Sequence, residues 1–135
     1  MHVEVSWDGD ERFKALTDSK FEVMIDRDLD KGPRPMEYIL VGLGGCASVD
    51  MMSILKKARQ DVTACVAVIN AERADAVPAV FTKIHLTFKV TGRKLKPAAV
   101  ERAARLSAEQ YCSVSKMLEG GGVEISHAVE IIEAE

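Results

Sequence analysis

A chain of 135 residues in which 47% of the side chains are hydrophobic can bury one substantial core, so we expect a single domain over residues 1–135. Eighteen basic and 21 acidic residues give a net charge of −3, and no cluster of basic and aromatic residues occurs, which argues against a nucleic-acid-binding protein. The first residues lack an export signal, and Glu37 and Asp50 interrupt the most apolar stretch, so we expect a cytoplasmic protein without a membrane segment.

The first third of the chain has the pattern of a small β-meander. Short runs rich in β-branched and aromatic residues occupy 3–7, 13–16 and 21–25, with turn-forming residues between them. We therefore predict three short strands joined by tight turns. The sequence Gly-Pro-Arg-Pro, which ends at Pro35, breaks this pattern and marks the start of a different element.

The residues after Pro35 predict a long helix that is largely buried. Gly42, Gly44 and Gly45 lie inside it, where each glycine costs about 1 kcal/mol relative to alanine. Two interpretations remain open: a small-residue surface that another helix approaches closely, which we favour, or a break of the helix at the paired glycines. The apolar side chains that recur at intervals of three and four residues are Met36, Ile39, Leu40, Leu43, Ala47, Met51, Ile54 and Leu55.

The second half of the chain predicts two strands, a helix and a last strand. Residues 62–72 and 80–91 have strand patterns, and the second alternates apolar and polar side chains, so one of its faces should meet the core. Pro97 opens an amphipathic helix, and glycines at 120–122 separate its tail from a strand at 123–132. The order βββ-α-ββ-α-β predicts an α+β fold with an antiparallel sheet packed on helices.

Two cysteines carry the strongest functional signal. Cys46 lies in Gly-Gly-Cys-Ala-Ser on the first predicted helix, and Cys112 lies in Tyr-Cys-Ser-Val-Ser beyond the second. Because no Cys-x-x-Cys pair occurs, we predict a thiol pair that folding brings together rather than a local redox or zinc hairpin. In a reducing compartment, a bridge between them would be transient and catalytic. Cys65, inside a predicted strand, is expected to be structural.

Three segments, Pro-Met-Glu-Tyr-Ile-Leu from Pro35, Gly-Gly-Cys-Ala around Cys46 and Tyr-Cys-Ser-Val-Ser around Cys112, together resemble the OsmC/Ohr family. This is the family of osmotically inducible and organic hydroperoxide resistance proteins, and the segments are most similar to its YhfA-like branch. The resemblance implies an interwoven homodimer whose antiparallel sheets wrap around central helices. It also implies that Cys46 is the peroxidatic thiol, which reduces organic hydroperoxides, and that Cys112 is the resolving thiol, which closes a disulfide. An external dithiol, often a lipoylated protein in the family's peroxidases, would restore both thiols.

The sequence departs from the family's peroxidases at two positions. In those proteins an acidic residue directly follows the proline and pairs with an arginine near the reactive thiol, whereas here Met36 follows Pro35 and the carboxylate is Glu37. A shift of one residue turns a helical side chain by about 100°. In the second motif, Ser113 follows Cys112 where those peroxidases usually have proline.

Cys46 needs a cation, because a free cysteine is only a few per cent thiolate at neutral pH. An unbroken helix from Pro35 would place Cys46 about 16 Å from the helix N-terminus, beyond the reach of the helix dipole. The resemblance offers Arg12 as the nearest counterpart of the family's arginine and Glu37 as its carboxylate. By the same helical rise Glu37 lies about 13 Å from Cys46, so we expect it to act from the partner subunit of a dimer.

Two functions remain open. The first is a thiol peroxidase that reduces organic hydroperoxides through Cys46 and Cys112 in oxidative stress defence. The second is a non-peroxidase dimer of the same fold that binds an apolar small molecule. We expect no cofactor and assign no metal, because His2, His85 and His127 lie on separate predicted strands and no pair of them has metal-ligand spacing.

Overall fold

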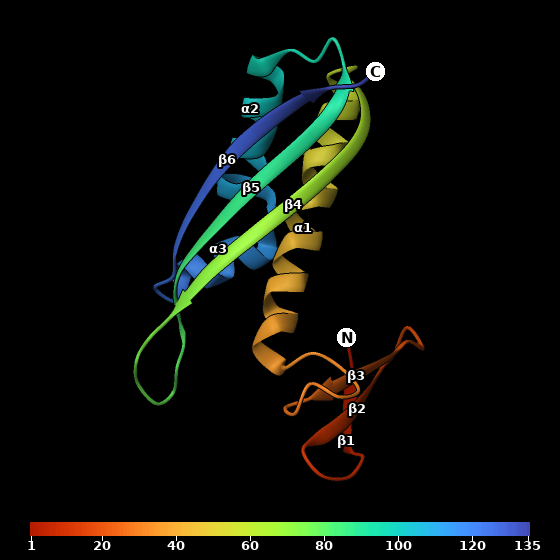
Figure 1. Ribbon diagram of the computed structural model, residues 1–135, viewed down its shortest axis with the longest axis vertical. Coiled ribbons are helices and arrows are strands. Elements are labelled where there is room, and N and C mark those ends of the chain that lie inside the picture. The colour runs from red at the N-terminus through yellow and green to blue at the C-terminus, as the bar shows by residue number, and fades with distance from the viewer. The chain divides into compact units, whose positions relative to one another are not determined.

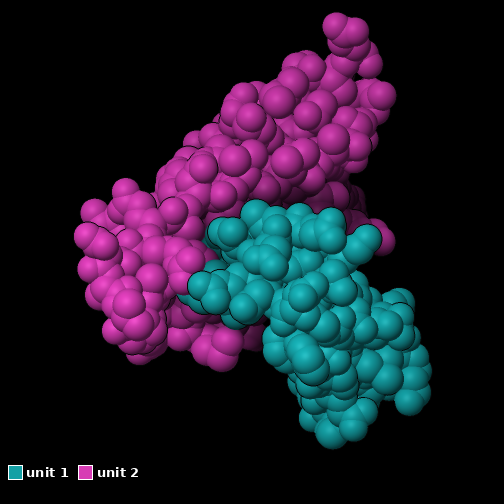
Figure 2. All heavy atoms as spheres, turned by 60° about the horizontal axis from the view of Figure 1, so that its bottom comes forward, with its two compact units in different colours: residues 1–41 teal, residues 42–135 magenta.

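The computed structural model describes all 135 residues of the chain. They form two compact units, unit 1 (Met1–Val41) and unit 2 (Gly42–Glu135), which are teal and magenta in Figure 2. Each unit contains one three-stranded sheet (Figure 1). The predicted α+β class is confirmed, and a single domain over residues 1–135 stays a prediction.

Unit 1 contains the predicted β-meander. Strands β1 (Val3–Trp7), β2 (Arg12–Thr17) and β3 (Glu22–Asp26) pair antiparallel in the order β1-β2-β3. Gly9 lies in the turn between β1 and β2 with φ of +95°, in the left-handed region that glycine adopts without strain. The strand bounds differ from the predicted ones by no more than one residue at either end.

The meander leaves much of its apolar surface exposed. Every residue of β1 is exposed, and Trp7 keeps 70% of its surface accessible. Ala15 is the only buried hydrophobic residue in unit 1. A small sheet with so little buried apolar surface has little stability of its own.

Asp26 organises the loop that follows β3. Its carboxylate accepts hydrogen bonds from the backbone N–H groups of Asp28 at 2.9 Å and Lys31 at 3.0 Å. Burial alone would raise the pKa of Asp26, but these hydrogen bonds, a third from Asp30 and the nearby Arg12 guanidinium hold that pKa below its ordinary value. Arg12 therefore interacts with a charged carboxylate of its own unit.

Unit 2 consists of a three-stranded sheet with helices on one face (Figure 1). Strands β4 (Asp61–Arg73) and β5 (Phe81–Arg93) pair antiparallel, whereas β5 and β6 (Glu124–Glu133) pair in parallel. The parallel pair corrects the prediction that the sheets are antiparallel throughout. It arises because the chain between β5 and β6 crosses over through helices, and such a crossover brings the next strand back in the same direction.

Helix α1 (Pro35–Lys57) continues without a break through its three glycines. A Cβ atom at Gly44 would lie 2.7 Å from Cδ1 of Ile69 on β4, well inside van der Waals contact. Close packing therefore explains Gly44, although the neighbour is a strand side chain and not a helix. At Gly42 and Gly45 a Cβ atom would meet nothing within 4 Å, so close packing there stays a prediction.

The predicted second helix is split into two. Helix α2 (Pro97–Leu106) runs into a π-helical turn, η1 (Ser107–Tyr111), and α3 (Ser113–Gly120) begins after Cys112. Cys112 has an extended backbone, with φ of −71° and ψ of 107°, so it ends the first helix and caps the second. Residues 98–119 contain neither proline nor glycine, so the sequence carries no ordinary signal for this break.

The core of unit 2 lies between the sheet and the helices. The predicted alternation along β5 is confirmed, because Ile84, Leu86, Phe88 and Val90 are at most 1% exposed. This packing fixes α1 and α2 against the sheet and so positions the residues on their adjoining faces. The fully buried residues that α1 and α2 contribute are Leu43, Ala47, Met51, Leu55, Val100, Ala103 and Ala104.

Helix α1 is strongly apolar. By length and composition alone it could cross a membrane, with a mean hydropathy of 1.6 over 18 residues. The core helix of a water-soluble protein has the same composition. Leu43, Met51 and Leu55 pack into the core of unit 2, but only 28% of this apolar window is buried, so the prediction of a largely buried helix is wrong for the single chain.

Candidate functional site

Cys46 and Cys112 lie together in unit 2. Their Sγ atoms and a carboxylate oxygen of Asp50 are all within 4.8 Å of one another. Cys46 and Asp50 are one turn apart on α1, and Cys112 joins them from the N-terminus of α3. Both cysteines are free thiols. The prediction that folding brings these two thiols together is confirmed, and their catalytic roles stay predictions.

Two buried serines hold the elements that carry the cysteines. Ser107 Oγ on η1 donates a hydrogen bond to the backbone oxygen of Ala47 at 2.7 Å, and Ser115 Oγ on α3 donates one to the backbone oxygen of Ala108 at 2.9 Å. The N–H of Ser115 also donates to Cys112 Sγ at 3.4 Å. Neither serine was predicted to hold these elements together, although Ser115 ends the Tyr-Cys-Ser-Val-Ser motif. For Ser107, the available signal was a polar residue inside the amphipathic helix predicted to begin at Pro97.

The two thiols differ in burial. Cys112 is fully buried, and this burial raises the pKa of its thiol to about 11. The neighbouring Cys46 sulfur raises that pKa as well, while the N–H groups of Ser115 and Val114 oppose the shift. Cys46 is only half-buried. Because Cys46 is the more accessible thiol, it is the better placed of the two to meet a substrate first.

Asp50 is a member of the site that the sequence analysis did not identify. Its four-residue spacing from Cys46 on a predicted helix was the available signal, since residues so spaced share a face. Asp50 bears a carboxylate and no positive charge, so it cannot take the part of the activating cation that a thiolate needs. Together, the carboxylate oxygen and the two sulfurs are also atoms of the kind that hold metal ions.

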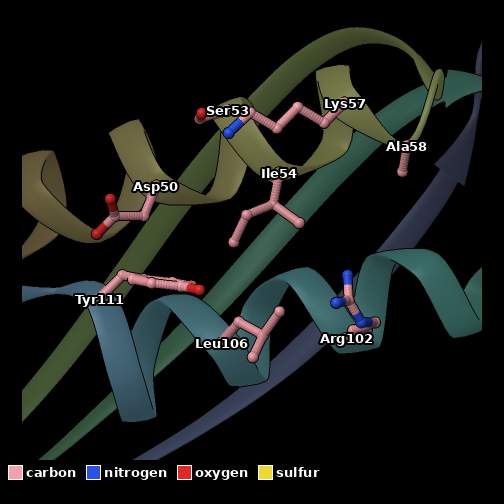
Figure 3. Close-up of a pocket in the computed structure, with 8 residues that line it drawn as sticks. All are labelled: Asp50, Ser53, Ile54, Lys57, Ala58, Arg102, Leu106 and Tyr111. Atoms are coloured by element: carbon pink, nitrogen blue, oxygen red, sulfur yellow. The ribbon is translucent and has the colours of Figure 1, made fainter.

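A groove of about 440 Å³ lies between α1 and α2, and Asp50 of the cysteine cluster lines it (Figure 3). Asp50 lies toward one end of the groove, Lys57 and Arg102 lie toward the other, and Ile54 and Leu106 point into its middle. The groove therefore has an apolar centre between an acidic and a basic end. Its lining consists of Asp50, Ser53, Ile54, Lys57, Ala58, Arg102, Leu106 and Tyr111.

The sequence profile of a family described as "OsmC-like protein" matches residues 26–128 of the chain. The chain belongs to the OsmC-like family. It is 45% identical to Protein YhfA of Escherichia coli over 135 residues, which cover 99% of this chain and 100% of the relative. The predicted resemblance to this family and to its YhfA-like branch is therefore confirmed.

Solved structures share the OsmC-like fold. A hypothetical protein from Aquifex aeolicus matches with a TM-score of 0.89 and 30% identity, covering 99% of this chain and 97% of the other. The organic hydroperoxide resistance protein OhrB of Bacillus subtilis matches with a TM-score of 0.64 and 14% identity, covering 96% and 98%. At such low identity the likeness to OhrB concerns the fold alone.

The remaining two predicted site residues of this OsmC-like chain lie in unit 1. Arg12 begins β2, and its Nη2 donates a hydrogen bond to the backbone oxygen of Asp8 at 3.4 Å. Glu37 lies in the first turn of α1, where its Oε1 accepts a hydrogen bond from the N–H of Arg34 at 3.0 Å, as in a capping box. For both residues a role beside Cys46 stays a prediction.

Proposed function

We propose that this protein is a thiol-dependent redox protein that reduces organic hydroperoxides in cytoplasmic oxidative stress defence. The supporting observation is a pair of free sulfurs within 4.8 Å of each other, with Cys46 half-buried and Cys112 fully buried. Membership of the OsmC-like family adds support, because the family's fold is also that of a protein named for organic hydroperoxide resistance.

The reaction begins when the Cys46 thiolate attacks the terminal oxygen of the hydroperoxide. The O–O bond breaks, the alkoxide takes up a proton and leaves as the alcohol, and Cys46 becomes a sulfenic acid. Cys112 then forms a disulfide with the Cys46 sulfur, and the Cys112 proton leaves with the hydroxyl group as water. An external dithiol, such as a lipoylated protein, reduces the disulfide and is itself oxidised. Burial keeps Cys112 protonated until the sulfenic acid forms beside it.

We further propose that the protein is a homodimer in which Arg12 and Glu37 of one chain act on Cys46 of the other. Cys112 and Asp50, which lie within 4.8 Å of Cys46, carry no positive charge, so we place the activating cation on the partner chain. The exposed apolar residues support a partner chain, because Trp7 on β1 and Val49 on α1 are each 70% exposed.

A Gly45→Ala substitution tests the dimer. In the single chain nothing lies within 4 Å of a Cβ at Gly45, so alanine alone would stabilise the helix by about 0.5–1 kcal/mol. If two copies of α1 pack at this glycine, the added methyl group should instead weaken the dimer by about tenfold. Light scattering over a range of protein concentrations measures this change. Gly120→Ala, where a Cβ also meets nothing, is the matched control, and a wild-type monomer would contradict the proposal.

Mild oxidation tests the thiol pair. One equivalent of cumene hydroperoxide should convert the reduced protein to a form that lacks two hydrogen atoms, and digestion should recover a peptide linked through Cys46 and Cys112. Mass spectrometry measures both. A Cys65→Ser variant should form the same bridge in the same yield. Oxidation of Cys46 to the sulfenic acid without a bridge, or to the sulfinic acid with a second equivalent, would contradict the resolving role of Cys112. Protein left unoxidised would favour the alternative function, an apolar small-molecule-binding dimer, with the groove of Figure 3 as its candidate site.

A further inference from the structure

Cys46, Asp50 and Cys112 bring together three atoms of the kind that bind metals. Two are sulfurs and one is a carboxylate oxygen, and all lie within 4.8 Å of one another. In a tetrahedral zinc site, bonds of about 2.3 Å to sulfur and about 2.1 Å to oxygen place the ligand atoms about 3.5 to 3.8 Å apart. Only a small closure of the three side chains therefore separates the present arrangement from a zinc-binding one.

The donor set selects the metal. Thiolates favour zinc and other thiophilic cations, whereas magnesium and calcium prefer sites made of oxygen atoms alone. Three protein ligands leave one tetrahedral position for water or a small ligand. Asp50 also lines the groove of Figure 3, as does Tyr111, the neighbour of Cys112, so the cluster lies beside a space that solvent can enter.

The two elements that carry these ligands are tied together beside them. Ala47, which follows Cys46 on α1, accepts the buried 2.7 Å hydrogen bond from Ser107 on η1. The N–H of Ser115 donates to Cys112 Sγ at 3.4 Å and so orients that sulfur. Hydrogen bonds to ligating atoms of this kind fix ligand orientation and tune metal affinity.

We propose that the reduced protein binds one zinc ion per chain through Cys46, Cys112 and Asp50. Zinc binding requires only these three side chains of a single chain. It does not depend on peroxide turnover. Release of the zinc ion, unlike its binding, rests on the proposed peroxidase function. An organic hydroperoxide takes two electrons from the two thiolates and two protons from water, which yields the disulfide, the alcohol and one water molecule. Two of the three ligands are then lost, and the zinc ion leaves as the hydrated cation.

Zinc binding is tested with reduced protein that has been treated with a chelator and desalted. Titration with Zn²⁺ against a chromogenic zinc indicator should show one equivalent bound to the wild type. Cys46→Ser and Cys112→Ser should each abolish this binding. Asp50→Asn has nearly the same shape and keeps both thiols, and it should weaken binding about tenfold or more. Circular dichroism checks that each variant is folded.

Two substitutions outside the cluster serve as matched controls. Cys65→Ser removes a thiol and Glu109→Gln removes a carboxylate on η1, and neither should change zinc affinity. Thiolate-to-metal charge-transfer absorption of the Co²⁺ form should appear in the wild type and disappear in Cys112→Ser. Wild-type protein that binds no zinc, or an Asp50→Asn variant with unchanged affinity, would overturn the proposal.

The same proteins separate this inference from the peroxidase function. Both readouts are taken on the wild type, zinc binding on the reduced protein and disulfide formation with cumene hydroperoxide on the chelator-treated protein. If zinc binds to the wild type and no disulfide forms, the peroxidase function fails and the zinc site stands. If the disulfide forms and no zinc binds, the zinc site fails and the peroxidase function stands.

Discussion

A Cys46→Ser variant should lose the turnover of cumene hydroperoxide, by about 10³-fold or more relative to the wild type. Serine keeps the size of the side chain but offers a hydroxyl group, which neither ionises at neutral pH nor can be oxidised to a sulfenic acid. The measurement is hydroperoxide consumption with dihydrolipoamide as the dithiol. It is made on chelator-treated protein, so that a bound metal cannot block the thiols.

Two other substitutions make this result specific. Cys112→Ser should still react once with the peroxide and then stall, because its Cys46 sulfenic acid has no neighbouring thiol. A sulfenic-acid-trapping reagent should label this variant more strongly than the wild type. Cys65→Ser should keep the wild-type rate, since that cysteine lies on β4 outside the cluster. Equal and negligible consumption by all four proteins would remove the peroxidase function.

Most elements of the fold were predictable because their apolar residues follow simple periods. The alternation along β5 matched the core that forms around Phe88. Along α1 the three-and-four spacing matched the core at Leu43, Ala47, Met51 and Leu55 but not at Ile39, which is 41% exposed. The split after α2 was not predictable, because it depends on the extended backbone of Cys112 and on hydrogen bonds from buried serines. The parallel pairing of β6 was missed because strand direction depends on how the chain crosses the sheet.

The candidate site was predictable in part. Cys46 and Cys112 could be identified because each lies in a distinctive motif, but their distance is set by packing between helices far apart in the chain. Asp50 was missed because an acidic residue on a helix is usually a solvated charge, and only the fold brings it to the two sulfurs. Arg12 and Glu37 were predicted as site residues from the family resemblance alone. Their hydrogen bonds, to Asp8 and from Arg34, are with residues of unit 1.

Alkaline pH should destabilise the wild type more than a Cys112→Ala variant. The pKa of the Cys112 thiol is about 11 in the folded chain and 9.0 in an unperturbed cysteine, so the folded state holds the proton more tightly. The resulting stabilisation is fully present below pH 9 and is lost as the pH rises through 11. Between pH 8 and pH 11 the free energy of unfolding should therefore fall by about 2 kcal/mol more in the wild type than in the variant.

Urea denaturation followed by circular dichroism measures this difference at each pH, with a chelator present throughout. The Cys112→Ala variant is less stable at every pH because it loses a buried sulfur and the cap of α3, so the comparison uses the change with pH and not the absolute value. Cys65, whose pKa burial also raises, is present in both proteins and cancels in the comparison. Parallel curves would show that the Cys112 thiol ionises as readily in the folded chain as in the unfolded one. Cys112 would then have to be considered as an attacking thiol beside Cys46.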